Sequence, residues 1–242
     1  MKKFLQLLVS LFGYNIIKSS NFYKINRTLD QAIKSIIKKK NPIIFDVGAH
    51  EGESIDRFKN LFQNPIIHSF EPQSKIFEKL MNKKKNDKDL VLNNFALGSK
   101  EGNQEIFVNS NTAASSYLNI DNKDKFFKSL KTIKKEQTRI DTFDNYFNKI
   151  KVNYIDLVKI DVQGLEEEVL KGAHKSLNKV LLIEIEIVFV NLYEKHSSFY
   201  QIENILKNYD FELYSLSSIS LNKQNDRIRN LDALYYNTKI SI

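Results

Sequence analysis

The sequence predicts an α/β fold with a mostly parallel sheet of about seven strands. Two observations predict this fold. From Pro42 onward, short unbroken apolar runs alternate with stretches of helical spacing, which is the rhythm of βαβ units around a parallel sheet. The chain has 242 residues, of which 42% are hydrophobic and 27% charged, values typical of one large globular domain. We therefore expect one domain over residues 42–242, preceded by a helical extension over residues 1–41.

The predicted extension starts with two lysines and an apolar run. This resembles the start of a signal peptide, but no small-residue cleavage site follows. We favour a retained amphipathic helix that packs on the domain or lies at a membrane interface. Residues 22–40 continue with apolar side chains at helical spacing. No apolar stretch is long enough to cross a bilayer. We therefore expect a cytoplasmic protein, with peripheral membrane contact through the N-terminal helix left open.

The expected elements follow in order along the domain. Strands are predicted at residues 43–45, 65–70, 90–95, 155–160, 180–187, 211–216 and 233–236. Helices are predicted around residues 55–61 and at 74–82, 164–172 and 198–208. An insertion over residues 103–150 is predicted to hold a strand at 104–109, a polar loop around 111–117, a strand at 138–140 and a helix at 141–147. We expect substrate contacts in this insertion because loops carry specificity.

The charge distribution does not indicate nucleic-acid binding. Lys plus Arg number 37 and Asp plus Glu 29, which gives a formal net charge of +8. Few of the basic residues are arginine, on which base readout relies. We interpret the charge as a solvated surface and expect no nucleic-acid partner, with a polyanion such as a glycan phosphate or a lipid head group left open. The absence of cysteine excludes disulfides and cysteine-ligated zinc, and the sequence predicts no metal site.

Glycine placement marks a candidate ligand site directly after the first predicted strand. The chain has seven glycines, where average usage would give roughly 17, and Gly48 and Gly52 lie together in the run DVGAHEG. A strand, a glycine turn and a helix N-terminus bring backbone N–H groups up to a ligand. The dinucleotide fingerprint fails because His50 and Glu53 stand at its third and sixth positions. We expect Asp46 to accept N–H bonds of the turn and to reach the ammonium of an amino-acid moiety. The turn can form with His50 within it, because histidine is among the residues that tolerate a positive φ.

Two further acidic residues close predicted parallel strands. Glu71 ends the second strand, where a carboxylate can accept hydrogen bonds from both hydroxyls of a ribose. Pro72 stops that strand because proline has no N–H. Asp161 lies at the carboxyl end of the fourth strand, beside the cleft where ligands of open α/β sheets bind. Asp161 is therefore a candidate general base, or a group that orients a ligand.

Taken in this order, the motifs resemble the FkbM-type S-adenosylmethionine-dependent methyltransferases over about residues 42–215. The matching pieces are FDVGAHEG at 45–52, FEP at 70–72, ALG at 96–98, the Ser115–Ser116 loop, the stretch at 140–141, KIDVQG at 159–164 and the region at 167–173. The resemblance implies the class I methyltransferase (Rossmann-like) fold, with seven strands, helices on both faces and an antiparallel last strand. It also implies S-adenosylmethionine as the cofactor.

The resemblance further implies roles for individual residues in binding the methyl donor. The implied residues are Asp46, Gly48, Ala49 and Gly52 around the methionine part, Glu71 with Pro72 at the ribose, Asn94, Phe95 and Ala96 by the adenine, and Asp161 facing the reactive end or the acceptor.

Methylation of an alcohol releases a proton, and a nearby base accelerates such a step by roughly 10²–10⁴-fold. Asp161 is the first candidate for this base, and His50, at the cleft mouth, is the second. Residues expected to contact the substrate are Ser115, Ser116, Gln163, Glu184 and Glu186.

The predicted function is O-methylation of a hydroxyl on a sugar, glycan or related small molecule. The family usually has Glu where Gln163 stands and Asn where His50 stands. The departure at Gln163 motivates an alternative hypothesis, a non-catalytic binding or scaffold protein on the same fold. A nicotinamide-dependent enzyme is disfavoured because the glycine spacing does not match.

Overall fold

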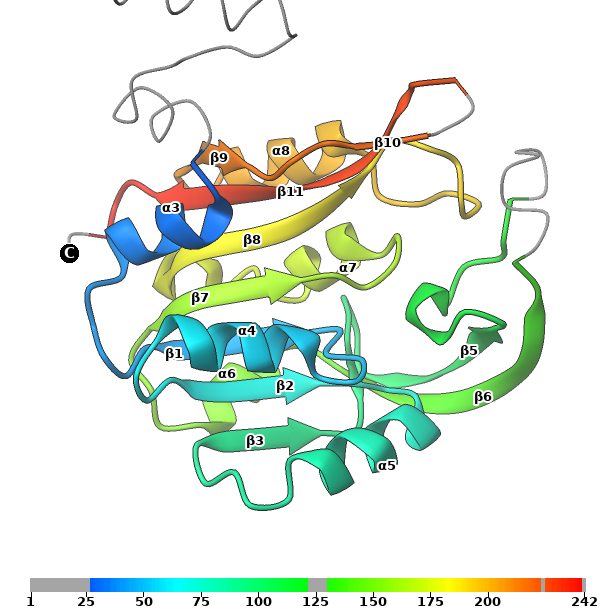
Figure 1. Ribbon diagram of the computed structural model, residues 1–242, viewed down its shortest axis with the longest axis horizontal. Helices are drawn as coiled ribbons and strands as arrows, with labels where there is room; N and C mark the ends of the chain where they lie inside the picture. The colour runs from blue at the N-terminus through cyan, green and yellow to red at the C-terminus, as the bar shows by residue number, and fades with distance from the viewer. Residues whose placement is uncertain (1–26, 122–129, 223–224, 241–242) are drawn as a thin grey trace, which may run out of the picture.

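The computed structural model describes residues 27–121, 130–222 and 225–240, so the helix predicted at the start of the chain lies outside the described residues. These residues form three layers, a central sheet with helices on both faces (Figure 1). A smaller sheet stands beside one end of the central one.

The central sheet confirms the predicted strands and their parallel order. Its order is β10-β11-β8-β7-β1-β2-β3, and β9 also pairs with β11. Five neighbouring strands, β3, β2, β1, β7 and β8, are parallel, whereas β11 runs antiparallel to β8. The short β10 adds an eighth strand to the seven that the sequence predicts. The strands are β1 (Ile43–Val47), β2 (Ile66–Phe70), β3 (Leu90–Asn93), β7 (Ile155–Ile160), β8 (Val180–Val188), β9 (Phe211–Leu216), β10 (Ser220–Leu221) and β11 (Ile228–Asn237).

Helices cover both faces of this sheet, as predicted. Figure 1 shows α3 (Leu29–Ile36), α4 (Glu53–Leu61) and α5 (Ser74–Lys83) on the near face, and α6 (Phe143–Lys149), α7 (Glu166–Lys171) and α8 (Phe199–Lys207) behind it. Side chains alternate between the faces along a strand. On β1, Ile44 joins the cluster under α3 and α4, whereas Phe45 and Val47 join the cluster under α6 and α7.

Helix α3 falls within the predicted extension but packs on the sheet. Thr28 caps it by a capping box with Gln31, which satisfies backbone N–H groups at its start. Its buried side chains, such as Ile33, lie in the same cluster as Ile44 and Leu157 of the central strands. The hydrophobic core of the domain therefore begins before residue 42.

The insertion forms a three-stranded sheet together with β4 (Ala96–Leu97), which precedes it in the chain. The order of this sheet is β4, β6 (Thr132–Asp141) and β5 (Gly102–Asn109), and the short helix η1 (Thr112–Ala114) follows β5. The sequence predicts most of β5 but only the last part of β6. The earlier part of β6 is rich in lysine and mostly exposed, so it lacks the apolar alternation that reveals a strand. Its pairing with β5 defines it instead.

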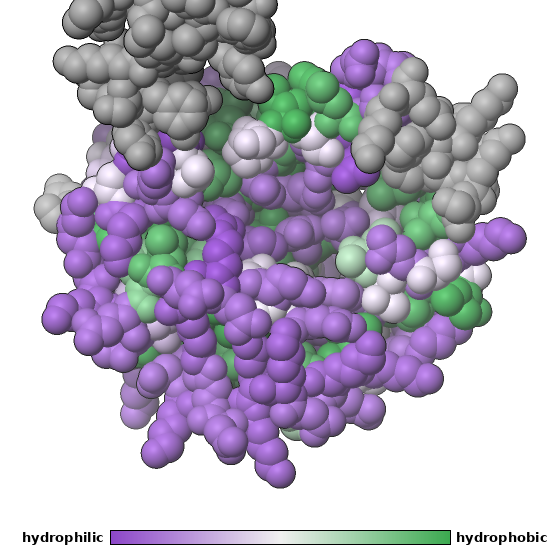
Figure 2. All heavy atoms as spheres, in the orientation of Figure 1, coloured by the Kyte–Doolittle hydropathy of each residue, from purple (hydrophilic) through white to green (hydrophobic). Residues whose placement is uncertain are grey.

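The surface over α4 and α5 is mainly hydrophilic (Figure 2). Lysines there meet carboxylates, as in the pairs of Lys79 with Glu51 at 2.9 Å and of Lys84 with Asp56. None of the helices in the described ranges combines the length and the apolar character needed to cross a bilayer.

Candidate functional site

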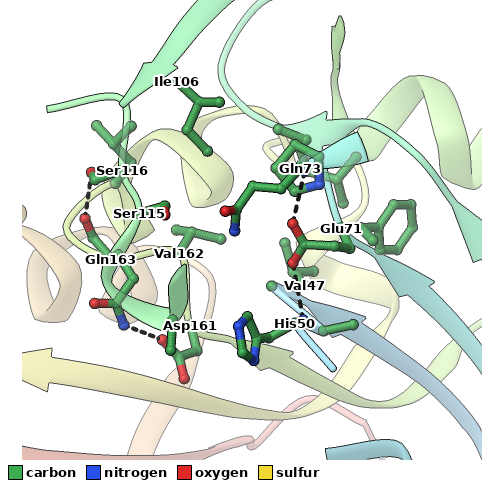
Figure 3. Close-up of a pocket in the computed structure, with 18 of the residues that line it drawn as sticks. Val47, His50, Glu71, Gln73, Ile106, Ser115, Ser116, Asp161, Val162 and Gln163 are labelled. Carbon is green, nitrogen blue, oxygen red and sulfur yellow. Dashed lines mark hydrogen bonds between the residues drawn. The ribbon is translucent and has the colours of Figure 1, made fainter. Parts of the chain in front are cut away.

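A cavity lies at the carboxyl ends of β1, β2 and β7, where ligands of open α/β sheets bind. We call it the main cavity because most of the predicted site residues line it. Its volume is about 390 Å³, within the roughly 300–1,000 Å³ of small-molecule pockets. Ile106 of β5, with Ser115 and Ser116 directly after η1, lines another side of this cavity (Figure 3). The structure brings these predicted site residues to its lining: Gly48, Ala49, His50, Glu71, Pro72, Ala96, Ser115, Ser116, Asp161 and Gln163.

The turn after β1 requires glycine at position 48. Gly48 has φ +90°, and a Cβ there would lie 1.9 Å from the carbonyl oxygen of Asp161, so a larger residue is excluded. The N–H groups of Gly48 and Ala49 both donate to the carbonyl of Phe70 at 3.0 Å. The prediction that the Asp46 carboxylate accepts them is therefore wrong. His50 has φ +46°, which confirms that it tolerates this conformation.

Glu71 presents a carboxylate that is already oriented by the backbone. Its Oε2 accepts the N–H of His50 at 3.0 Å, and its Oε1 accepts the N–H of Gln73 at 2.8 Å. The residue is 3% exposed, and burial raises its pKa to about 7 against the lowering effect of these two bonds. Each oxygen keeps a further lone pair. A vicinal diol in the cavity could therefore donate to both oxygens, as predicted from the sequence.

Gln73 is a cavity residue that sequence reasoning missed. Its side chain extends into the cavity (Figure 3), and its Nε2 donates to the carbonyl of Thr112 at 3.2 Å. Its buried Oε1 has no hydrogen-bond partner among the described residues. Buried polar atoms are normally paired, so this oxygen is free to accept an N–H of a ligand. Its place directly after the FEP motif was the available signal.

Asp161 lies at the opposite end of the cavity in a paired state. Its Oδ2 is 3.3 Å from Lys159 Nζ, and its Oδ1 accepts from Gln163 Nε2 at 2.8 Å. Burial pushes the pKa of Asp161 up, but the charge of Lys159 and the bond from Gln163 outweigh burial and leave the pKa lowered. A carboxylate held ionised is a weak base. This environment favours the orienting role for Asp161 over the role of general base.

Asp46 is buried beneath the cavity and does not line it. It is 0% exposed, and neither carboxylate oxygen has a hydrogen-bond partner among the described residues. Burial raises its pKa to about 6, while the charge of Lys159 acts in the opposite direction. Asp46 and Lys159 are register partners on β1 and β7. The sequence did not indicate that Lys159 would be the cation between Asp46 and Asp161.

The two predicted substrate residues of β8, Glu184 and Glu186, lie in different surroundings, and the prediction for Glu184 is wrong. Glu184 does not line the main cavity, because Arg57 binds its two oxygens at 2.6 and 3.0 Å and it is 2% exposed. It stabilises α4 against the sheet instead of binding substrate. Glu186, two residues further along β8, lies near the carboxyl end of the strand. Its Oε2 accepts a hydrogen bond from Gln163 Nε2 at 3.2 Å.

The segment after β3 contributes less to the cavity than predicted. Asn94 donates to the carbonyl of Glu71 at 2.9 Å, and Phe95 packs against Phe70 with ring centroids 5.6 Å apart. Only Ala96 of the three predicted adenine neighbours lines the cavity. Gly52 is the N-cap of α4 and lies outside the lining.

His50 lies across the cavity from Gln163. Its Nε2 is 3.0 Å from Thr112 Oγ1, and its Nδ1 is 3.8 Å from Glu53 Oε2. The ring is thus held between η1 and the start of α4. The role of His50 as a base stays a prediction.

The residues present fit the predicted cofactor. Glu71 offers paired acceptors for a ribose diol, and Asp161 offers a negative charge for a cationic end. Pro72, Leu97 and Ile106 supply apolar surface for a flat base. Within the described ranges, no group of three or more potential metal ligands is arranged to hold an ion.

Comparisons with known proteins agree with this geometry. Residues 46–213 match the family model described as the methyltransferase FkbM domain. The 2-O-methyltransferase NoeI of Sinorhizobium fredii is 23% identical over 220 residues, which cover 84% of this chain and 88% of that protein.

Among solved structures, a candidate rRNA methylase from Clostridium thermocellum has a TM-score of 0.51 at 11% identity, covering 94% of this chain and all of that one. A candidate methyltransferase from Streptococcus mutans in complex with S-adenosylhomocysteine has a TM-score of 0.47 at 14% identity, covering 91% and 99% of the two chains. The first of these likenesses supports the class I methyltransferase fold.

Proposed function

This chain belongs to the FkbM methyltransferase family, and from that premise we propose that it methylates a hydroxyl oxygen of a sugar, glycan or related small molecule. Its methyl donor is S-adenosylmethionine. The observation that carries the proposal is the pair of carboxylates at two strand ends of one cavity. Glu71 directly follows β2, Asp161 directly follows β7, and both line the main cavity.

The two carboxylates suit different parts of the donor. Glu71 has two backbone-oriented oxygens, which suit the ribose hydroxyls. Asp161 keeps its charge beside Lys159, which suits the cationic methionine end. Held in this way, the donor is aligned with its acceptor, and alignment can supply up to roughly 7–11 kcal/mol of the barrier.

Transfer to oxygen is supported by the relative whose name states 2-O-methylation. The cavity wall also carries the hydroxyls of Ser115 and Ser116, although both are already engaged. Ser115 Oγ accepts the N–H of Asn109 at 3.1 Å, and Ser116 Oγ donates to the carbonyl of Gln163 at 2.7 Å. Each hydroxyl can still form a further hydrogen bond, so contact of these two serines with the acceptor stays a prediction.

The alternative, a non-catalytic binding protein, is motivated by Gln163. An amide cannot serve as a base, and here it donates to Asp161 and accepts from Tyr193 at 3.1 Å. Labelled-methyl transfer into a glycan fraction separates the two functions. A protein that binds the donor and never transfers its methyl group would be a scaffold.

Calorimetric titration with S-adenosylhomocysteine tests donor binding. We expect wild-type protein to bind it and Glu71→Ala to weaken binding by about 10- to 100-fold, through the loss of two hydrogen bonds to the ribose. Glu51→Ala is the matched control, because Glu51 pairs with Lys79 on the surface. Absence of binding to the wild-type protein at millimolar ligand would overturn the proposal.

A further inference from the structure

A second cavity of about 550 Å³, the side cavity, adjoins the main cavity. It lies at the ends of β8 and β11, facing the loop around η1. Ala113 and Gln163 line both cavities. Gln163 therefore lies between the main cavity, which suits the donor, and this second cavity.

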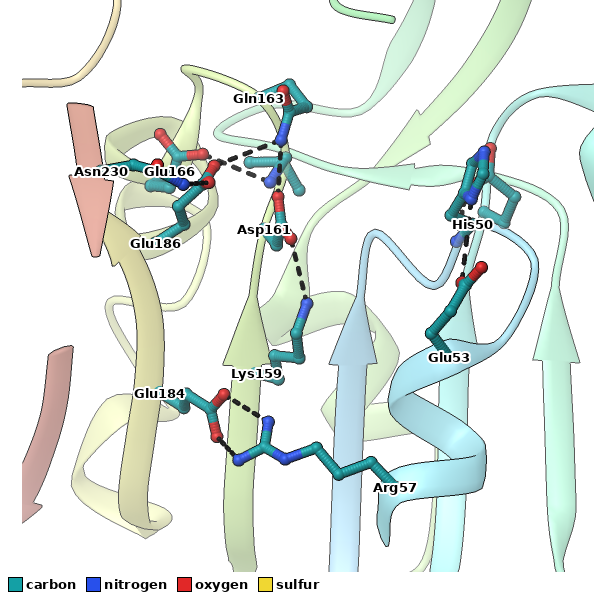
Figure 4. A network of polar contacts seen from close by, with 12 residues as sticks. His50, Glu53, Arg57, Lys159, Asp161, Gln163, Glu166, Glu184, Glu186 and Asn230 are labelled. Carbon is teal, nitrogen blue, oxygen red and sulfur yellow. Dashed lines mark hydrogen bonds and ion pairs between the residues drawn. The ribbon is translucent and has the colours of Figure 1, made fainter. Parts of the chain in front are cut away.

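A row of hydrogen bonds runs from one cavity to the other (Figure 4). Gln163 Nε2 donates to Asp161 at 2.8 Å and to Glu186 Oε2 at 3.2 Å. Asn230 Nδ2 donates to Glu186 Oε1 at 2.7 Å, and Arg229 Nε donates to Asn230 Oδ1 at 3.2 Å. Glu186 therefore brings a carboxylate to the side cavity, as Asp161 does to the main cavity.

Glu186 differs from Asp161 in basicity. Burial raises the pKa of Glu186 well above its usual value, and the charges of Asp161 on β7, Glu166 on α7 and Asp232 on β11 add to this rise, against the bond from Asn230. No lysine or arginine forms an ion pair with Glu186 within the described ranges. A base whose pKa lies closer to the working pH accepts a proton more readily.

Arg229 adds a positive charge to the side cavity. Within the described residues, the arginines in ion pairs are Arg57 and Arg139; Arg229 has no carboxylate partner there. The remaining lining combines polar Ser110 and Asn111 with apolar side chains. This mixture suits a polyhydroxylated ring that carries an anionic group.

We propose that the side cavity binds the methyl acceptor, a polyhydroxylated molecule with an anionic substituent on Arg229, and that Glu186 takes the proton of its reacting hydroxyl. The inference rests on the proposed function and deepens it. The acceptor oxygen forms the bond to the methyl carbon, and the electron pair of the broken carbon–sulfur bond stays on sulfur. The hydroxyl proton passes to the Glu186 carboxylate.

The first test measures acceptor binding to the full-length protein saturated with S-adenosylhomocysteine. D-glucuronate and D-glucose are the probes, because they differ only at C6. We expect D-glucuronate to bind at least about fivefold more tightly, and Arg229→Gln to remove this preference. Arg227→Gln is the control, since Arg227 is exposed and does not line the cavity.

Equal binding of the two sugars, binding of neither, or a preference that persists in Arg229→Gln would overturn the inference. Binding of S-adenosylhomocysteine is measured in the same samples. Its loss in the wild-type protein would instead refute the proposed function, so the two failures are distinguishable.

The second test follows labelled-methyl transfer to D-glucuronate from pH 5 to pH 9. We expect the rate of the wild-type protein to rise with pH as Glu186 loses its proton. Glu186→Gln should lower kcat by about 10²–10⁴-fold, abolish that rise and leave the KM for the donor within about twofold. Glu194→Gln, an exposed residue outside both cavities, should behave as wild type. A Glu186→Gln protein with a wild-type pH profile, or no transfer to a bound D-glucuronate, would overturn the inference.

Discussion

Replacement of Asp46 by Asn should stabilise the ligand-free protein at neutral pH. The Asp46 carboxylate is 0% exposed and has no hydrogen-bond partner among the described residues. Its pKa is raised from 3.8 to about 6, chiefly by burial. The side chain is thus ionised at neutral pH in an environment that disfavours the charge. Asparagine has nearly the same shape and no charge, so it removes this cost.

The magnitude follows from the two pKa values. Because the folded-state pKa lies above the unfolded one, folding takes up a proton between about pH 4 and pH 6, and the contribution of Asp46 to stability falls as pH rises through that window. The difference between 3.8 and about 6 corresponds to about 3 kcal/mol at pH 8, at 1.36 kcal/mol per pH unit. About half of this cost is present at pH 5.

Urea unfolding at pH 5 and pH 8 measures this effect. Asp46→Asn should be more stable than wild type at pH 8 by up to about 3 kcal/mol, and its advantage should shrink by about 1.4 kcal/mol at pH 5. The control is Asp56→Asn, because Lys84 lowers the pKa of Asp56 and the substitution should not stabilise the protein. An Asp46→Asn advantage that is absent at pH 8, or equal at both pH values, would refute the reasoning.

Three further substitutions have definite expected outcomes. Gly48→Ala should destabilise the fold by at least about 2 kcal/mol, seen as a lower Tm, because its Cβ would meet the Asp161 carbonyl at 1.9 Å; an unchanged Tm would contradict the turn geometry. Glu184→Gln should cost about 2–3 kcal/mol in urea unfolding, less than the roughly 3–5 of a fully buried pair, because Arg57 is 29% exposed and keeps Asp30. A cost near zero would mean that the pair does not stabilise α4. Glu71→Gln should weaken S-adenosylhomocysteine binding in calorimetry by about tenfold, and unchanged affinity would remove Glu71 from the donor site.

Much of the fold could be predicted because its signals are local. Apolar runs such as Ile43–Phe45 identify strands without reference to the rest of the chain. Gly48 marks the turn because its positive φ is a local property of the backbone, although its contact with the Asp161 carbonyl is not. Parallel strands bring their carboxyl ends to one edge. That rule is enough to place Glu71 and Asp161 at one cavity before any side chain is positioned. The lysine-rich start of β6 could not be predicted in this way, because neither face of that part of the strand is clearly apolar.

The α/β order, the glycine turn and the acidic residues at the strand ends therefore follow from local sequence signals. Which side chains meet depends on the folded arrangement of the strands. Strand register places Lys159 between Asp46 and Asp161, and the face of each strand decides that Glu184 binds Arg57 whereas Glu186 reaches a cavity. This is because the environment of an ionisable side chain decides whether it is charged and what it binds. Burial and pairing set the protonation of a carboxylate, and both depend on residues distant in the chain.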